Sequence, residues 1–129
     1  MPIDTDVRIM NSGSTNTLGF TLTLAQNGTA TLEQGDATEQ KQLPEAMVAN
    51  FFATLRASGP LDALPETLCI KSKSFGTTTR IFFGGKVSPD ISCPSPNTLV
   101  QELSNKATAV LDAAGARVVP RRTLTGRPP

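Results

Sequence analysis

The chain has 129 residues and a net charge of +1, 38% of its residues are hydrophobic, and all six of its aromatic residues are phenylalanine. This length and composition fit one ordinary globular domain with an aliphatic core and exclude a disordered chain. No apolar run approaches the ~18 residues that a membrane-spanning helix needs, so no span is expected, and no basic start followed by an apolar segment marks a signal peptide.

The first residues predict a strand and then a loop. Residues 6–10 (DVRIM) have strand character, and residues 11–16 (NSGSTN) consist of loop-forming residue types. Within this loop, Ser12, Ser14 and Thr15 are candidate contacts for a partner, because loops that project from a rigid scaffold often carry binding function.

Residues 17–34 predict a β-hairpin. Hydrophobic residues alternate with Thr and Gly up to Leu24, and the Asn27-Gly28 pair marks a tight turn. A three-residue loop that ends at Gly28 places Leu24 opposite Ala30 and keeps the apolar residues of both strands on one face. A two-residue loop would place the apolar residues of the second strand on the opposite face of the hairpin. The register therefore favours the longer loop.

A first helix is predicted over residues 43–55, where hydrophobic residues recur at spacings of three, four and five. Pro44 suits the first turn of this helix, and residues 58–60 (SGP) end it. The next residues, 61–64 (LDAL), are expected to form one short turn over the core.

A second hairpin is predicted over residues 67–83. Pairing two strands about a turn at Phe75-Gly76 places Ile70 opposite Ile81 on a buried face. Phe75 at the tip of this hairpin is another candidate contact for a partner.

A further strand is expected after this hairpin, because the Gly84-Gly85 turn brings Val87 across from Phe82. The next loop contains Pro89 and Asp90, which are the last candidate contact residues.

The second helix is predicted over residues 99–114, with either Ser95 or Asn97 as its N-terminal cap and Gly115 at its C-terminal end. Residues 116–129 contain three prolines and four arginines, so this tail is expected to be loosely held.

Together these elements predict a single α+β domain over residues 1–115. It consists of an antiparallel sheet of about five to six strands, made by two passes of strand, hairpin and helix, with both helices packed on one face.

The two cysteines, Cys69 and Cys93, are predicted to form a disulfide. The chain has no histidine and no closely spaced cysteine pair, so a zinc site is not expected, and two buried free thiols are the alternative. A disulfide that closes a loop of this length would stabilise the fold by about 3 to 4 kcal/mol. An oxidised pair implies the periplasm, the cell surface or the exterior, whereas a reduced pair implies the cytoplasm.

Catalytic motifs are not found. The absence of histidine excludes a Cys-His or Ser-His nucleophile, and residues 71–74 (KSKS) offer a Ser-Lys pair only in the pattern of a solvated strand face. No phosphate-binding glycine motif occurs either. The chain is therefore predicted to be non-catalytic, without a cofactor or a metal.

A basic sheet face is the least favoured candidate site. The predicted strands place Lys71, Lys73, Arg80 and Lys86 together, which could bind nucleic acid. Binding of single strands also uses exposed aromatic side chains, and the chain has no tyrosine or tryptophan.

The order of elements resembles a known family. A Gly/Ser-rich loop, the hairpin GFTLTLAQNGTATL, a helix, further strands and a closing helix are similar to the emfourin family, proteinaceous inhibitors of thermolysin-like metalloproteases. The stretch 69–94 is also similar to a segment of uncharacterised exported proteins of soil bacteria. These resemblances imply an exported bacterial domain that binds a protein and inhibits a protease, but they identify no inhibitory residue in this chain.

The predicted function is thus binding of a protein partner. The alternative is a small-ligand or lipid binder, which would need a cavity above ~300 Å³ between sheet and helices, lined by Phe51, Phe52 and Phe83.

Overall fold

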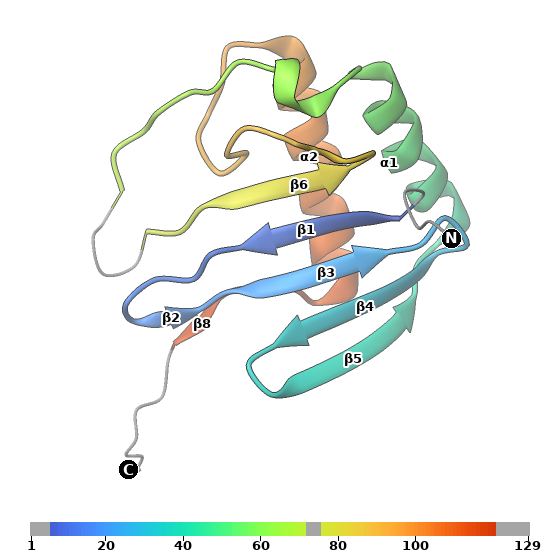
Figure 1. Ribbon diagram of the computed structural model, residues 1–129. Coiled ribbons are helices and arrows are strands. Elements are labelled where there is room, and N and C mark those ends of the chain that lie inside the picture. The colour runs from blue at the N-terminus through green and yellow to red at the C-terminus, as the bar shows by residue number, and fades with distance from the viewer. Residues whose placement is uncertain (1–5, 72–75, 121–129) are drawn as a thin grey trace.

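The computed structural model describes residues 6–71 and 76–120. Its main feature is an antiparallel six-stranded sheet in the order β5-β4-β3-β1-β6-β7, with both helices on one face (Figure 1). The predicted α+β class and the one-sided helix layer are therefore confirmed. The strands of the sheet are β1 (Val7–Asn11), β3 (Phe20–Leu24), β4 (Thr29–Gln34), β5 (Ala37–Gln42), β6 (Thr79–Phe83) and β7 (Lys86–Val87). A second, two-stranded sheet pairs β2 (Thr17–Leu18) with β8 (Val119–Pro120).

The β3–β4 hairpin has the predicted register. Leu24 pairs with Ala30 and Leu22 with Leu32. Gly28 has a φ of 95°, a conformation that glycine adopts without the steric penalty of a Cβ atom. The apolar residues of both strands consequently face the helices.

Both helices follow the predicted hydrophobic stripes. Helix α1 (Glu45–Ala57) begins after Pro44. The 3-10 helix η1 (Leu61–Ala63) then provides the expected short turn. Helix α2 (Thr98–Ala114) is capped by Asn97, whose Oδ1 accepts a hydrogen bond from the backbone N–H of Val100 at 3.0 Å.

The core lies between the sheet and the two helices. Alternate residues of β1, β3 and β6 contribute Ile9, Leu22 and Ile81, each with no exposed surface. The rings of Phe52 and Phe83 lie 5.9 Å apart, and those of Phe51 and Phe52 lie 6.2 Å apart.

The predicted hairpin over residues 67–83 is wrong. Residues 67–71 form no strand, and Ile81 of β6 pairs with Ile9 of β1 instead of with Ile70. One edge of β6 is occupied by β1 and the other by β7, so no edge is left for a further strand. The predicted pairing of Phe82 with Val87 is confirmed. Phe75 lies outside the described residues.

Two further features differ from the sequence prediction. Strand β5 has no signal in the sequence, because all six of its residues are exposed and it has no apolar periodicity. The first residues of the predicted loose tail pack on the domain: Ala116 is buried, and Val119 of β8 pairs with Leu18. The carbonyl oxygen of Arg117 accepts a hydrogen bond from Gln34 Nε2 at 2.8 Å.

Candidate functional site

Residues 66–71, here called the braced segment, combine an exposed apolar surface with three anchors to the domain. The segment runs as extended chain beyond η1, at the left of the molecule in Figure 1. Leu68 is 89% exposed and Ile70 is 102% exposed, whereas the other exposed large hydrophobic residues that the structure describes lie between 36% and 42%. Burial of such a side chain stabilises a protein by about 1.5 to 3 kcal/mol. The exposure of two of them on one short segment therefore marks a candidate interaction site.

The first anchor is Glu66. Its carboxylate accepts hydrogen bonds from Arg80 Nη1 at 3.1 Å and from the backbone N–H of Asp90 at 3.1 Å. The Arg80 guanidinium holds the pKa of Glu66 below its usual value. Because Arg80 lies on β6, Glu66 ties the start of the segment to the sheet.

The second anchor is the disulfide between Cys69 and Cys93, which confirms the predicted bridge. The two Cα atoms are 5.6 Å apart, and Cys93 is buried. Cys69 lies in the middle of the braced segment and not on a sheet strand, where the sequence pattern places it. The bridge therefore fixes the segment between its two exposed hydrophobic residues.

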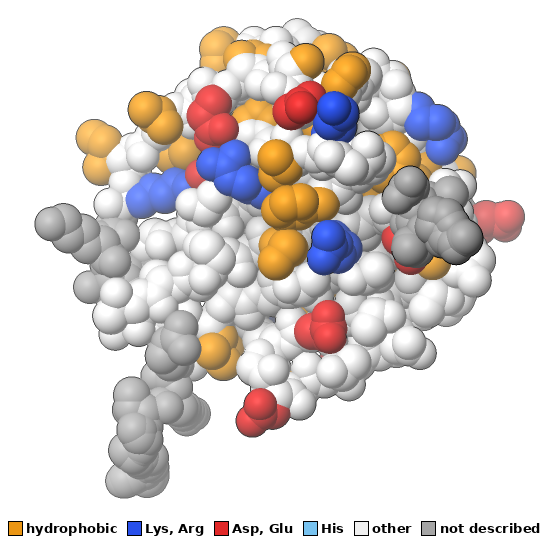
Figure 2. Space-filling model, in the orientation of Figure 1, with side chains coloured by type: hydrophobic (Ala, Val, Ile, Leu, Met, Phe, Trp, Pro, Cys, Tyr) orange, Lys and Arg blue, Asp and Glu red, His pale blue; other side chains and the backbone are white. Residues whose placement is uncertain are grey.

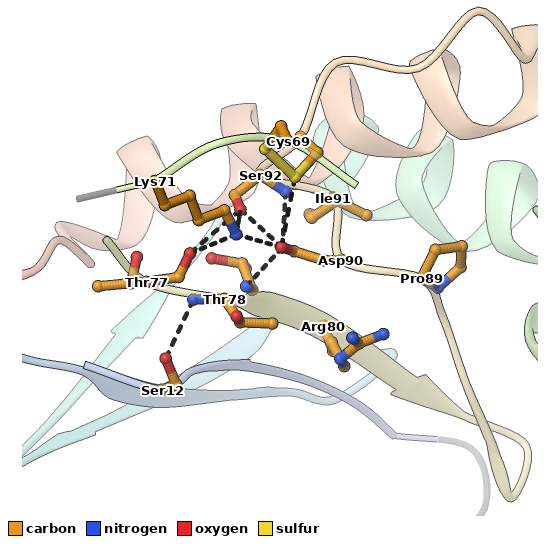
Figure 3. A network of polar contacts seen from close by, with 12 residues as sticks. Ser12, Cys69, Lys71, Thr77, Thr78, Arg80, Pro89, Asp90, Ile91 and Ser92 are labelled. Atoms are coloured by element: carbon orange, nitrogen blue, oxygen red, sulfur yellow. Dashed lines mark hydrogen bonds and ion pairs between the residues drawn. A yellow bond between two sulfur atoms is a disulfide. The ribbon is translucent and has the colours of Figure 1, made fainter. Parts of the chain in front are cut away.

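The third anchor is Lys71, shown in Figure 3. Its Nζ donates hydrogen bonds to the carbonyl oxygen of Thr77 at 2.7 Å and to Ser92 Oγ at 2.8 Å. The same ammonium forms an ion pair with Asp90 Oδ2. These three partners satisfy the donors of the ammonium group and fix the end of the segment.

Asp90 is the centre of this polar network. It is 6% exposed, and its Oδ1 accepts hydrogen bonds from the backbone N–H of Thr79 at 2.9 Å and from Ser92 Oγ at 2.6 Å. Burial raises the pKa of Asp90, but the hydrogen bonds from Lys71, Ser92 and Thr79 outweigh burial and lower the pKa overall. Asp90 is therefore a buried carboxylate at neutral pH, and it holds Lys71 at the end of the braced segment.

The residues of the predicted contact loops differ in their exposure and in their hydrogen bonds. Pro89 and Asp90 are buried, so they belong to the interior and not to an exposed contact surface. Ser12 donates its backbone N–H to the carbonyl oxygen of Thr78 at 2.9 Å, which holds the predicted 11–16 loop beside the start of β6.

In that same loop, Ser14 and Thr17 are joined through their hydroxyl groups at 2.6 Å, while Thr15 is exposed. The loop and the braced segment lie at the same end of the sheet (Figure 1).

The predicted basic face is not a basic surface in the described part of the chain. Lys71 pairs with Asp90, Arg80 with Glu66, and Lys86 with Asp62 at 3.8 Å, as the three ion pairs show. Lys73 lies outside the described residues. Each described cation of that set thus has an acidic neighbour that reduces its attraction for phosphate.

The face of the sheet opposite the helices is open, and Figure 2 looks onto it. Met10 and Val87 are 36% and 37% exposed there, and the Arg8 guanidinium lies 5.6 Å from the centre of the Phe82 ring. A hollow of about 530 Å³ borders this ring. This face is a second exposed surface, but its hydrophobic residues are much less exposed than those of the braced segment.

Within the ranges 6–71 and 76–120, no three His, Cys, Asp or Glu side chains are grouped so that they could hold a metal ion. In the same ranges, no helix has the length and apolar character needed to cross a membrane. Comparison of the chain with models of known protein families, with curated proteins and with solved structures finds no match.

Sequence reasoning misses several residues of this site. The alternation of Leu68 and Ile70 with polar residues predicts a buried strand face, and no motif indicates a role for Glu66. The Asp90-x-Ser92 spacing is a usable signal, because an Asp side chain commonly accepts a hydrogen bond from the backbone two residues later, as Asp90 does from Ser92 at 3.0 Å.

Proposed function

We propose that this protein is an exported, non-catalytic domain that binds a protein partner through the braced segment. The observation that carries this proposal is the full exposure of Leu68 and Ile70 on a segment anchored by Glu66, Cys69 and Lys71. The exposure supplies apolar surface for a partner, and the anchors limit the number of conformations that the free segment samples.

Rigidity favours binding for a physical reason. A flexible segment loses conformational entropy when it is ordered by a partner, whereas a pre-organised one has already lost it on folding. Large side chains that fill pockets at the centre of an interface contribute most of the binding free energy. Leu68 and Ile70 are placed to act as such anchors, and the nearby Thr15 loop would lie at the rim.

Export is supported by the disulfide, since such bridges persist in oxidising compartments. Inhibition of a protease, which the likeness to the emfourin family implies, is a narrower form of the same proposal.

The alternative functions have less support. The ring of Phe52 packs against the rings of both Phe51 and Phe83, so these three side chains fill space between the sheet and the helices instead of lining a cavity there. Nucleic-acid binding is disfavoured because Lys71, Arg80 and Lys86 are paired with carboxylates.

The test compares three immobilised proteins: the wild type, a Leu68→Ser/Ile70→Ser double variant, and a Leu99→Ser control. Leu99 is a suitable control because it is 42% exposed and lies in the first turn of α2, outside the braced segment. Each protein is incubated with the extracytoplasmic fraction of the cells that make it, and retained proteins are quantified by mass spectrometry.

We expect one protein to be retained by the wild type and by the control, and to be reduced at least ~10-fold on the double variant, because two central apolar anchors are removed. Equal retention on all three proteins would contradict the proposal. Thermal melting of each variant verifies that the fold is intact.

A further inference from the structure

We infer that two copies of this chain associate edge to edge through β5, in an antiparallel pairing centred on Gln40 that joins their two sheets into one. The partner is a second copy of the chain, because the charges of β5 complement one another in this pairing. The surface lies on a different edge of the sheet from the braced segment, and it is independent of the proposed function.

Strand β5 forms an open edge of the main sheet. It is the first strand in the order β5-β4-β3-β1-β6-β7, and Figure 1 shows no described element beyond it. All six of its residues are exposed. A hollow of about 290 Å³, bordered by Ala37, Glu39 and Gly115, leaves room for the side chains of an added strand. An open edge of this kind is a template for pairing with another chain.

Every second residue of β5 directs its backbone groups away from β4. Gln34 and Ala37 flank a two-residue turn and pair across the hairpin, so they exchange hydrogen bonds, and the pattern alternates from there. The hydrogen bond from the N–H of Leu43 to the carbonyl oxygen of Gly28 at 3.0 Å continues this alternation. The outward N–H and C=O groups, which have no partner among the described residues, are those of Thr38, Gln40 and Gln42.

These outward groups restrict how a second β5 can pair. An outward-facing residue must lie opposite an outward-facing residue of the second copy, because only such pairs exchange hydrogen bonds. The two symmetric registers that align most of β5 are centred on Glu39 and on Gln40. The first places two Glu39 carboxylates opposite each other, which is unfavourable. The second places Glu39 opposite Lys41 of the second copy, and the two-fold symmetry repeats this ion pair.

The charges of Glu39 and Lys41 are available for this pairing. Neither residue takes part in the three ion pairs of the described residues. Within the hairpin they lie opposite Leu32 and Ala30, which are uncharged. In the register centred on Gln40 they form non-hydrogen-bonded pairs, in which side chains of the two strands come closest. Charges on an open edge usually oppose pairing, whereas these two favour one register with a second copy.

The pairing leaves the braced segment exposed. This segment is anchored to Arg80 of β6, and three strands separate β6 from β5 in the sheet. A dimer joined through β5 therefore presents two braced segments away from its interface. A partner that also carries two sites would bind such a dimer more tightly than a monomer, because the second contact is intramolecular.

Sedimentation equilibrium of the full chain, from ~1 μM to ~1 mM, measures the association. We expect a monomer–dimer equilibrium for the wild type. Glu39→Lys and Lys41→Glu should each weaken dimerisation at least ~10-fold, because each creates two like-charge pairs at the interface. An equimolar mixture of these two variants should form a mixed dimer, since every cation then faces a carboxylate. The double variant Glu39→Lys/Lys41→Glu should dimerise like the wild type for the same reason.

Two control variants locate the effect on β5. Glu102→Lys changes the net charge as Glu39→Lys does, but Glu102 is exposed on α2, so this variant should dimerise like the wild type. Leu68→Ser/Ile70→Ser should also dimerise like the wild type, because the braced segment lies outside the interface. Thermal melting verifies that each variant is folded.

Hydrogen exchange supplies a second measurement. The outward N–H of Gln40 should exchange more slowly as the protein concentration rises, whereas that of Glu39, which is bonded to β4, should not depend on concentration. A wild type that stays monomeric at ~1 mM would overturn the inference. So would a mixture of the two single variants that fails to associate, or a dimer that is lost in Leu68→Ser/Ile70→Ser and kept in Glu39→Lys.

Discussion

Asp90 shows how one buried side chain supports an exposed site. Its carboxylate joins Lys71 of the braced segment to Ser92 and to the backbone of Thr79 on β6. A buried charge without partners destabilises a fold strongly, whereas this one is paired and hydrogen-bonded. The position of the segment therefore depends on the ionised form of Asp90.

Replacing Asp90 with asparagine should lower the free energy of unfolding by about 2 to 4 kcal/mol at pH 7, because Lys71 loses its ion pair in a partly buried site. Urea denaturation measures the change. Asp112→Asn is the matched control, since Asp112 is exposed on α2, and it should change stability by less than about 0.5 kcal/mol.

The same residue predicts a pH dependence. The pKa of Asp90 is lowered in the folded state, so its stabilising contribution is complete above the unfolded value of about 3.9 and is lost as the pH falls through the lower folded value. The difference in stability between the wild type and Asp90→Asn should therefore shrink in urea titrations as the pH is lowered from about 5 to 2. A difference that stays constant over this range would show that the charge of Asp90 does not act in this way.

At the scale of elements, Gly19 joins β2 to β3 at a very close approach of backbone segments. A Cβ atom at this position would lie 2.0 Å from the carbonyl oxygen of Asn11 and 2.5 Å from the backbone nitrogen of Gly13. Both contacts are with backbone atoms, which cannot rotate away as a side chain can.

Gly19→Ala should therefore destabilise the protein by more than about 3 kcal/mol, as measured by thermal or urea unfolding. Gly84→Ala is the control. Gly84 has a φ of 62° but nothing within 4 Å of its added Cβ, so only the backbone conformation opposes the change, by about 1 to 2 kcal/mol. Similar losses in the two variants would contradict the proposed backbone clash.

Local patterns predict the elements that bury one face. The β3–β4 register follows from the position of Leu24 and Ala30 relative to Gly28, and both helices follow from their hydrophobic stripes. Strand β5 cannot be found in this way, because its polar residues are held by backbone pairing with β4 and not by burial.

Long-range pairing explains the other error. Leu68 and Ile70 have the alternation of a strand, and only the pairing of β1 with β6, about 70 residues apart in the chain, shows that no edge is left for them. The contact of Lys71 with Asp90, 19 residues further along the chain, is also indicated by no local motif. The disulfide can be predicted because the chain has only two cysteines and no histidine. Its position between two exposed hydrophobic residues cannot be predicted in this way.

At the scale of the whole molecule, the C-terminal part of the described chain completes the domain. Ala116 is buried, the Arg117 carbonyl accepts a hydrogen bond from Gln34, and β8 pairs with β2. The structural domain thus extends beyond the predicted boundary at residue 115.

A chain that ends at Gly115 should consequently be less stable than one that ends at Pro120, by about 1 to 3 kcal/mol, because it loses one buried side chain and these hydrogen bonds. Equilibrium unfolding of the two truncated chains measures the difference. Equal stability would place the boundary of the domain at residue 115, as the sequence predicts.

The disulfide acts on the whole molecule through the unfolded state. It joins positions 24 residues apart, and closing a loop of this size lowers the entropy of the unfolded chain. Cys69→Ser/Cys93→Ser should lower the free energy of unfolding by about 3 kcal/mol, and the reduced wild type should behave like this variant. Adding reductant to the variant itself is the control and should change nothing. Insensitivity of the wild type to reductant would contradict this role. Two free thiols in protein that is alkylated during isolation from its native cells would contradict the oxidising location from which export is argued.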